Sequence, residues 1–238
     1  MKRKTRKTRP DALHPGRGDR DSDAGRRFAA EAAYADSIFR SALGDTAGAV
    51  AALDRALEAL PTYAPAMLSL GSVEYQRRRS ARGRRLFLAL LDLPDDTPDL
   101  CEIIDTAGDY LIQSRAYVDG LDLYRGAADR FPDVAVFHQG VGCCAGHLGL
   151  HDEAIAASRV ALELESDNQK FVNDLGWSLY QAGRLEEARR VLERAVAMDP
   201  TDTLAAENLR VCMSTVAPSR GRPPRARRAG DRRTTAEE

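Results

Sequence analysis

The chain has 238 residues, of which 43% are hydrophobic and 30% charged, with 35 Lys and Arg against 36 Asp and Glu. This composition excludes a wholly disordered or fibrous chain, and the length suits one compact domain or two small ones. Aromatic residues make up only 6%, and no run reaches the roughly 18 apolar residues that span a membrane, so we expect an all-α protein without a membrane segment.

The chain begins and ends with basic segments that are poor in large apolar residues. Residues 1–30 hold ten Lys or Arg against four Asp, and residues 219–238 hold seven Arg against three acids. Such segments bury too little surface to offset the entropy of ordering them. We therefore predict disordered tails at 1–25 and 218–238 around an acidic domain at 26–217. Because no apolar stretch follows the basic start MKRKTRKTRP, we expect a cytoplasmic protein, and the Ala- and Arg-rich composition is typical of a GC-rich bacterial genome.

Between the tails, small residues return with a period of 34 residues. Gly176 stands in register with Gly142 and Gly108, and Ala195 stands in register with Ala161. Apolar residues recur around them at intervals of three and four, which predicts two amphipathic helices in each unit. About three extra residues near 97–100 lengthen the connection between the second and third units. In chain order we predict helical hairpins at 30–63, 64–97, 101–134, 135–168 and 169–202, followed by a capping helix at 203–216.

The fifth unit carries the fullest set of residues at fixed spacing: Val172, Leu175, Gly176, Leu179, Ala188, Leu192, Ala195 and Pro200. This pattern resembles the tetratricopeptide repeat family over most of residues 30–202. The resemblance implies an α-solenoid of about five helix-turn-helix repeats, acting as a non-catalytic scaffold for protein–protein interaction. Some positions depart from the family pattern and predict less regular units: Asp36, Ser37, Gly83, Gly120 and Ser158.

The first helix of each unit lines the concave face in this family, and that face typically receives an extended peptide or a partner's helix. By position, the resemblance places these residues in the groove: Tyr34, Ile38, Leu68, Ser72, Tyr75, Glu102, Asp105, Asp109, Gln139, Cys143, Asn173, Trp177 and Tyr180. The acids at 102, 105 and 109 share one helical face, so we expect a basic or amide-rich protein segment as the ligand. Tyr34 and Ile38 replace the Lys and Asn with which some members grip heat-shock chaperones, so we do not expect that activity. Trp177 is a candidate anchor.

A cluster of six Arg supports an alternative interpretation. Arg77, Arg78, Arg79, Arg82, Arg84 and Arg85 form what we call the Arg77–Arg85 ridge. Together with the basic tails, the ridge could contact phosphates, as in a nucleic-acid- or ribonucleoprotein-associated adaptor. No aromatic residues interleave with these Arg residues as base-stacking platforms would. A solvated turn that balances the acidic body is the competing interpretation.

No catalytic or cofactor motif stands out, so we expect neither an enzyme nor a bound cofactor. One group of side chains resembles a metal site in composition: His138, Cys143, Cys144, His147 and His151. Cys143 and His147 lie four residues apart on one helical face, but the spacing matches no strong zinc motif, so we predict no metal. The Cys residues form no CxxC pair, and reduced thiols are expected. Self-association is left open.

Overall fold

The computed structural model describes residues 22–216, in which eleven α-helices and one 3₁₀ turn are connected by short loops and no strand occurs. The helices are α2 (Asp23–Ala42), α3 (Thr46–Ala59), α4 (Ala64–Gln76), α5 (Ser80–Leu88), η1 (Ala89–Asp92), α6 (Leu100–Gln113), α7 (Tyr117–Arg130), α8 (Ala135–His147), α9 (His151–Leu164), α10 (Gln169–Gln181), α11 (Leu185–Met198) and α12 (Thr203–Val216). Within residues 22–216, no helix combines the length and apolar character needed to cross a membrane.

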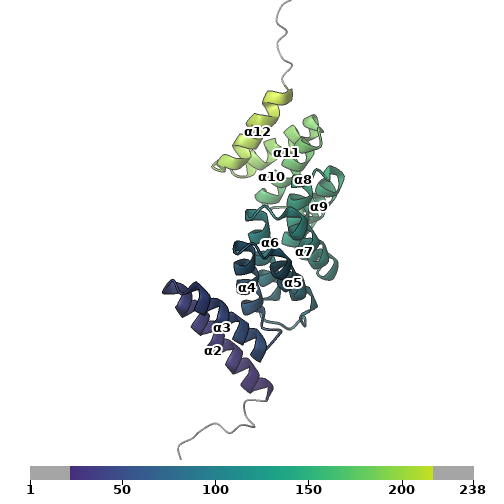
Figure 1. The fold of residues 1–238 in the computed structure, drawn as a ribbon. Coiled ribbons are helices and arrows are strands. Elements are labelled where there is room, and N and C mark those ends of the chain that lie inside the picture. The colour runs from purple at the N-terminus through teal and green to yellow at the C-terminus, as the bar shows by residue number, and fades with distance from the viewer. Residues whose placement is uncertain (1–21, 217–238) are drawn as a thin grey trace, which may run out of the picture.

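Consecutive helices pair into antiparallel hairpins, and the hairpins stack one upon the next from α2 to α12 (Figure 1). This arrangement confirms the predicted all-α solenoid. The helix bounds fall within the predicted units with two exceptions: α6 begins at Leu100, one residue before its unit, and α2 begins at Asp23, inside the stretch assigned to the N-terminal tail. The Ser22 side chain accepts a hydrogen bond from the Gly25 backbone N–H at 3.0 Å and so caps this earlier start. The rest of the two predicted tails lies outside the described residues.

Each hairpin closes around a small residue in its first helix. A Cβ atom on Gly108 would lie 2.2 Å from the Tyr124 ring, and one on Gly176 would lie 2.7 Å from the Leu192 side chain. The glycines therefore let paired helices approach until the large residue 16 positions later fills the crossing. Gly71 meets Phe87 in the same way.

Two units that depart from the repeat pattern retain the close helix crossing, but a serine hydroxyl lies at the crossing in each. In the fourth unit the large residue is replaced by Ser158, whose hydroxyl lies 3.2 Å from the Ser178 hydroxyl in the buried interior. In the first unit Ser37 takes the place of the glycine and is buried, with its hydroxyl donating to the Tyr34 carbonyl at 2.6 Å. Both buried hydroxyls thus have a hydrogen-bond partner, which buried polar groups require.

The longer connection between the second and third units is held by one side chain. After η1 the chain runs through 93–99, and Asp99 adopts a left-handed backbone conformation with φ 57°. Arg130 of α7 donates to the Leu91 carbonyl at 2.6 Å and pairs with Asp95. Of the extra residues predicted near 97–100, the first three lie in this loop and Leu100 begins α6, while Arg130 fixes the part of the connection that precedes them.

The second unit contains a fully buried carboxylate, that of Glu74. Arg82 donates to Glu74 Oε1 at 3.1 Å and to Asp54 Oδ1 at 2.6 Å. The other Glu74 oxygen has no hydrogen-bond partner, and its nearest cation is Arg79 Nη1 at 3.9 Å. Arg82 therefore carries most of the compensation for burying this charge.

Arg82→Ala is expected to lower the free energy of unfolding by about 2 kcal/mol, because it leaves the Glu74 carboxylate buried without its main partner. Urea unfolding followed by circular dichroism measures this loss. The matched control is Arg85→Ala, which removes an exposed Arg of the same helix and is expected to change stability by less than about 0.5 kcal/mol. Equal losses in the two variants would show that Arg82 does not stabilise Glu74.

Candidate functional site

The C-terminal half of the solenoid contains a hollow of about 730 Å³ between α6, α8, α10 and the start of α12. Its lining comprises Asp105, Asp109, Val136, Gln139, Asn168, Gln169, Lys170, Phe171, Asn173, Asp174, Asp199, Thr201, Asp202, Thr203 and Leu204. Five of these residues are aspartates, and Lys170 is the one basic residue among them. We call this surface the acidic groove.

The aspartates of the acidic groove differ from the other acids in their pairing. Elsewhere Arg side chains neutralise many acids, as Arg125 does for Glu153 at 2.6 Å and Arg84 for Asp122 at 2.7 Å. Across residues 22–216, no ion pair includes any of the five groove aspartates. The groove therefore presents five carboxylates that form no ion pair, with Lys170 as the single cation in their lining.

Two of these aspartates are held by a buried tyrosine. The Tyr124 ring is enclosed between α6 and α8, and its hydroxyl lies 3.1 Å from Asp105 Oδ1 and 3.4 Å from Asp109 Oδ1. Burial raises the pKa of the Asp105 carboxyl, and the neighbouring Asp109 charge raises it further, while the hydrogen bond from Tyr124 opposes the shift. The packing of Tyr124 in the core thus fixes the positions of the Asp105 and Asp109 carboxylates.

A chain of amide groups positions the next carboxylate. Gln139 Nε2 donates to Asp174 Oδ2 at 3.0 Å, and Asn173 Oδ1 accepts from Asn208 Nδ2 of α12 at 3.0 Å. Burial raises the pKa of Asp174 above the ordinary value, against the lowering effect of its hydrogen bond from Gln139. These contacts join α8, α10 and α12 along the floor of the acidic groove.

The remaining two aspartates serve the local backbone. Asp199 accepts from the Thr201 N–H at 2.9 Å, and Asp202 accepts from the Leu204 N–H at 2.8 Å, which caps the start of α12. The Thr201 hydroxyl donates to Asp199 and the Gln169 amide donates to Asp202, and these side-chain hydrogen bonds, with the backbone ones, lower the pKa of both carboxyls. These two groups stay ionised over a wider pH range than Asp105 and Asp174.

A second, smaller hollow of about 70 Å³ adjoins the acidic groove and shares Gln139 and Asp174 with it. Cys143, His147 and Trp177 line it, and Trp177 stacks on Tyr180 with ring centroids 5.0 Å apart. The groove therefore continues from a carboxylate region to an aromatic wall.

The chemistry at Cys143 is that of a neutral thiol. Burial raises its pKa to about 11, so the thiolate that binds metals or attacks electrophiles is scarce at neutral pH. The His147 ring stacks on Tyr117 with centroids 4.1 Å apart. In the described part of the chain, no three His, Cys, Asp or Glu side chains are placed to hold one metal ion.

The structure brings together six of the residues predicted for the groove. Asp105, Asp109, Gln139 and Asn173 line the acidic groove, while Cys143 and Trp177 line the adjoining hollow. Sequence reasoning missed Asp174, Asp199 and Asp202. Asp174 follows the expected groove position by one residue, and the other two lie in the loop before α12, which positions taken from first helices cannot cover. The dense Asp and Thr content of residues 199–203 is the signal that could have indicated them.

The other predicted groove residues lie elsewhere or serve the packing of the first three units. The Tyr75 ring stacks on Phe87 at 5.6 Å, and its hydroxyl donates to Asp119. Tyr34 packs edge-on against Tyr63. The rest have these surroundings: Leu68 packs on the main core, the Ser72 hydroxyl donates to the Leu68 carbonyl, Ile38 lines a separate hollow, Glu102 is exposed, and the Tyr180 hydroxyl lies 3.2 Å from the Thr215 hydroxyl.

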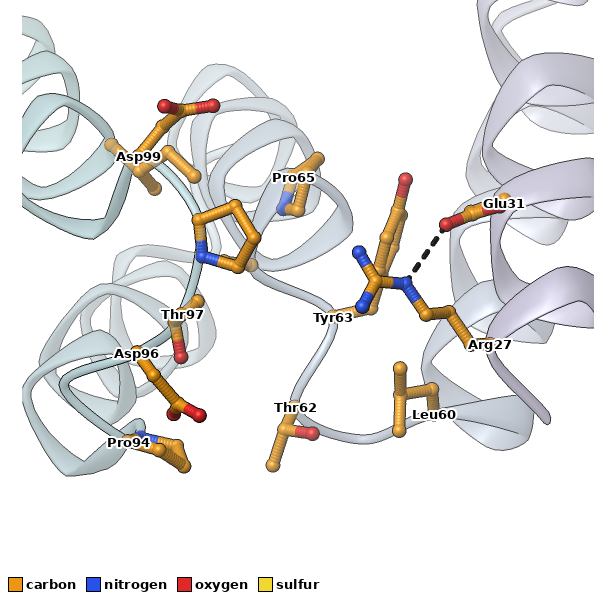
Figure 2. A pocket seen from close by; sticks show the side chains of 13 residues that line it. Arg27, Glu31, Leu60, Thr62, Tyr63, Pro65, Pro94, Asp96, Thr97 and Asp99 are labelled. Carbon is orange, nitrogen blue, oxygen red and sulfur yellow. Dashed lines mark hydrogen bonds and ion pairs between the residues drawn. The ribbon is translucent and has the colours of Figure 1, made fainter. Parts of the chain in front are cut away.

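Another hollow, of about 340 Å³, lies between α2 and the loops that follow α3 and η1 (Figure 2). Figure 2 shows Arg27, paired with Glu31, and Tyr63 facing the loop that carries Asp96 and Thr97. None of the predicted groove residues lines this hollow.

Two Arg side chains of the Arg77–Arg85 ridge, Arg82 and Arg84, form ion pairs with acids of the fold. Arg82 binds Glu74 and Asp54, and Arg84 lies 3.1 Å from Asp119 and 2.7 Å from Asp122. Arg77, Arg78 and Arg85 are exposed. The ridge is therefore a smaller cationic surface than the sequence indicates.

Stacked helical hairpins with a hollow along their first helices define a helical-repeat solenoid. Two separate segments, residues 40–98 and 147–210, match models of the tetratricopeptide repeat. The chain belongs to the tetratricopeptide repeat family.

Individual relatives are distant. A curated relative from Mycosarcoma maydis, small glutamine-rich tetratricopeptide repeat-containing protein 2, is 23% identical over 108 residues, which cover 45% of this chain and 31% of that protein. The chain thus matches less than a third of that relative's length. YrrB, a TPR protein described as having an unusual peptide-binding site, shares 19% identity with a TM-score of 0.52, over 74% of this chain and 89% of that one. MamA from Desulfovibrio magneticus RS-1 shares 14% identity with a TM-score of 0.53, over 73% of this chain and 97% of that one. These structures share the fold.

Proposed function

We propose that the protein is a non-catalytic interaction scaffold whose acidic groove binds a Lys- or Arg-containing segment of a partner protein. The observation that carries the proposal is the set of groove aspartates left without an ion-pair partner in a protein that pairs many of its other acids with Arg. Negative charge in a half-enclosed surface attracts cationic segments and repels acidic ones. YrrB, which shares the fold, is described as having a peptide-binding site.

The geometry also favours a peptide over a compact small molecule. The groove extends over three successive first helices and into the adjoining hollow, where Trp177 offers an aromatic face beside Asp174. A Lys or Arg side chain could reach a carboxylate while its apolar stem lies against Trp177. Amides at Gln139 and Asn173 supply polar contacts for a peptide backbone.

The nucleic-acid alternative remains the second candidate, and one experiment separates the two. Affinity purification uses the full-length chain as bait, with and without nuclease, beside a Trp177→Ala variant that still folds by circular dichroism. The proposal predicts a protein partner that survives nuclease treatment and is depleted from the variant. Recovery of only nuclease-sensitive material, unaffected by Trp177→Ala, would favour the basic tails and the Arg77–Arg85 ridge as the binding surface.

Binding of a cationic peptide is expected to weaken as the pH falls below 7 at constant ionic strength. Burial raises the pKa of Asp105 and Asp174, so these carboxyls take up protons at higher pH than exposed aspartates and lose their attraction for the ligand. Folding responds in the opposite sense. Because the folded state binds these protons more readily than the unfolded state, the destabilising effect of the two buried charges is relieved as the pH falls.

Isothermal titration of the peptide found by capture, at a series of pH values, measures the binding effect. The control is the Asp105→Asn, Asp174→Asn double variant, whose affinity is weaker at pH 7 and should vary less over this range. A wild-type affinity that is constant down to pH 5 would contradict the assigned role of these two carboxylates.

A further inference from the structure

Helix α2 forms the N-terminal end of the described solenoid (Figure 1). It carries large apolar side chains that no other described element covers. Phe28 is 73% exposed, Phe39 is 63% exposed and Leu43 is 68% exposed. The buried positions of α2, Ala30 and Ser37, lie on the opposite side of the helix. An exposed set of large apolar side chains on one helical face is typical of an interaction surface.

The pattern of this face is the same when read in either direction. Phe28, Ala32, Ala35 and Phe39 are all exposed and stand at intervals of four, three and four residues. These intervals place them in one stripe along α2, symmetric about a point between residues 33 and 34. We call these four residues the α2 stripe.

We propose that the α2 stripe is the contact through which two copies of this chain form an antiparallel, two-fold symmetric dimer. In that arrangement Phe28 of each copy lies against Phe39 of the other, and Ala32 lies against Ala35. The central alanines let the two helices approach closely, and the phenylalanines fill the space on either side. A two-fold contact requires a self-complementary surface, which this spacing provides.

The charges beside the stripe are compatible with this pairing because they are neutralised within each copy. Arg27 pairs with Glu31 at 3.0 Å, and Asp36 lies 2.9 Å from Arg40 and 2.6 Å from Arg55. The antiparallel register places Glu31 of one copy opposite Asp36 of the other, and the Arg partners of these two acids reduce the repulsion between them. In the antiparallel pair the N-terminal ends of the two α2 helices lie about 30 Å apart, the length of this helix.

Other parts of the same chain are less complementary to the α2 stripe than a second copy of α2 is. Residues 1–21 contain eight Lys or Arg, and their large apolar residues are Met1 and Leu13, while 217–238 contain none. By composition, these segments hold too few large apolar residues to match an apolar face of this size. The far end of the solenoid offers no complementary stripe, because its exposed apolar residues Leu204 and Met213 lie nine positions apart and so point to opposite sides of α12.

A dimer made through one helix pair buries less than a standard interface, so a Kd in the range of about 1–100 μM is expected. Each dimer would carry two acidic grooves and could bind a partner with repeated basic segments more tightly than one copy does. The dimer itself is independent of the proposed groove function and is tested without any peptide.

Sedimentation velocity of the full-length chain from about 1 to 200 μM measures the dimer directly. The expected result is a mass that rises from 26.0 kDa towards twice that value with concentration. Phe39→Glu, and independently Phe28→Glu, should weaken the dimer by at least about 30-fold, because each buries a charge against the partner's ring. Met213→Glu, which changes an exposed apolar residue of α12 outside the acidic groove, should leave it unchanged. Circular dichroism confirms that the variants fold.

A second measurement tests the antiparallel register. Chains with Ala32→Cys mixed with chains with Ala35→Cys should form a disulfide-linked dimer at least about fivefold faster than either variant alone, with the wild type as background for its own cysteines. A monomer throughout the concentration range, or a dimer insensitive to both Phe variants, would overturn the proposal. Equal cross-linking rates would overturn the antiparallel arrangement.

Discussion

Gly108→Ala is expected to lower the free energy of unfolding by about 2 kcal/mol, and Gly108→Ala with Gly140→Ala by about 4 kcal/mol. A Cβ on Gly108 would lie 2.2 Å from the Tyr124 ring, and one on Gly140 would lie 2.5 Å from the same ring. The fully buried ring has a glycine on each side and cannot move away from one without striking the other. The better helix propensity of alanine offsets only part of this cost. Urea unfolding measures both variants.

Gly126→Ala is the matched control, since it also places a methyl group on a glycine of a helix in the same unit. That methyl group would meet the Leu91 side chain at 2.5 Å, with no other heavy atom closer than 3.7 Å. The end of a leucine side chain can turn aside, so this variant is expected to be neutral or slightly stabilised. If it destabilises as much as Gly108→Ala, the enclosure of Tyr124 is not the cause of the loss.

Replacing the three central groove aspartates by asparagine should have opposite effects on binding and on stability. Asp105→Asn, Asp109→Asn and Asp174→Asn together are expected to weaken binding of a cationic peptide by about 100-fold, because the attracting charge disappears while the shape remains. The same change should raise the melting temperature at pH 7. Burial raises the pKa of Asp105 and Asp174, which means that their charged forms cost the folded state free energy.

A second triple variant serves as the control. It has the same net charge as the first triple variant but loses carboxylates outside the acidic groove. Asp129, Asp133 and Asp152 are exposed at the surface, and none of them lines the acidic groove. Their replacement by asparagine should change the affinity by less than about threefold at physiological salt, where separated surface charges are screened. Similar losses in the two variants would mean that net charge, rather than the acidic groove, attracts the peptide.

The fold was accessible from the sequence because the residues that determine it recur. Gly108 and Gly176 mark the helix crossings in register, and the large residues they face, Tyr124 and Leu192, follow at the same distance. Ser158 breaks the apolar pattern, yet the helix pair remains because Gly142 opposite is small and Ser178 supplies a hydrogen-bond partner. The start of α2 was misplaced because polar residues around Ser22 hide a capped helix start.

The candidate site was accessible only in part, because groove positions are not fixed by the repeat. Asp105 and Asp109 were found from helical spacing, but their link through Tyr124 depends on a core contact between α6 and α7. The groove position of Tyr75 stays a prediction, and the structure adds that its ring packs against Phe87, a contact that the position within the unit does not specify. Asp174 and Asp202 reach the groove through the curvature of the last hairpins and the capping helix, which no single unit encodes.

Fluorescence titration of Trp177, the only Trp in the chain, tests the central claim most directly. Its side chain lies beside Asp174 at the edge of the acidic groove, so a peptide bound there should change its emission. The titrants are two decapeptide pools of equal length and apolar content, one rich in Lys and Arg and the other rich in Asp and Glu. A saturable change with the basic pool, absent with the acidic pool and lost in the Asp105→Asn, Asp109→Asn, Asp174→Asn variant, is the predicted result. Equal responses to both pools, or a basic-pool response that survives in that variant, would contradict the account.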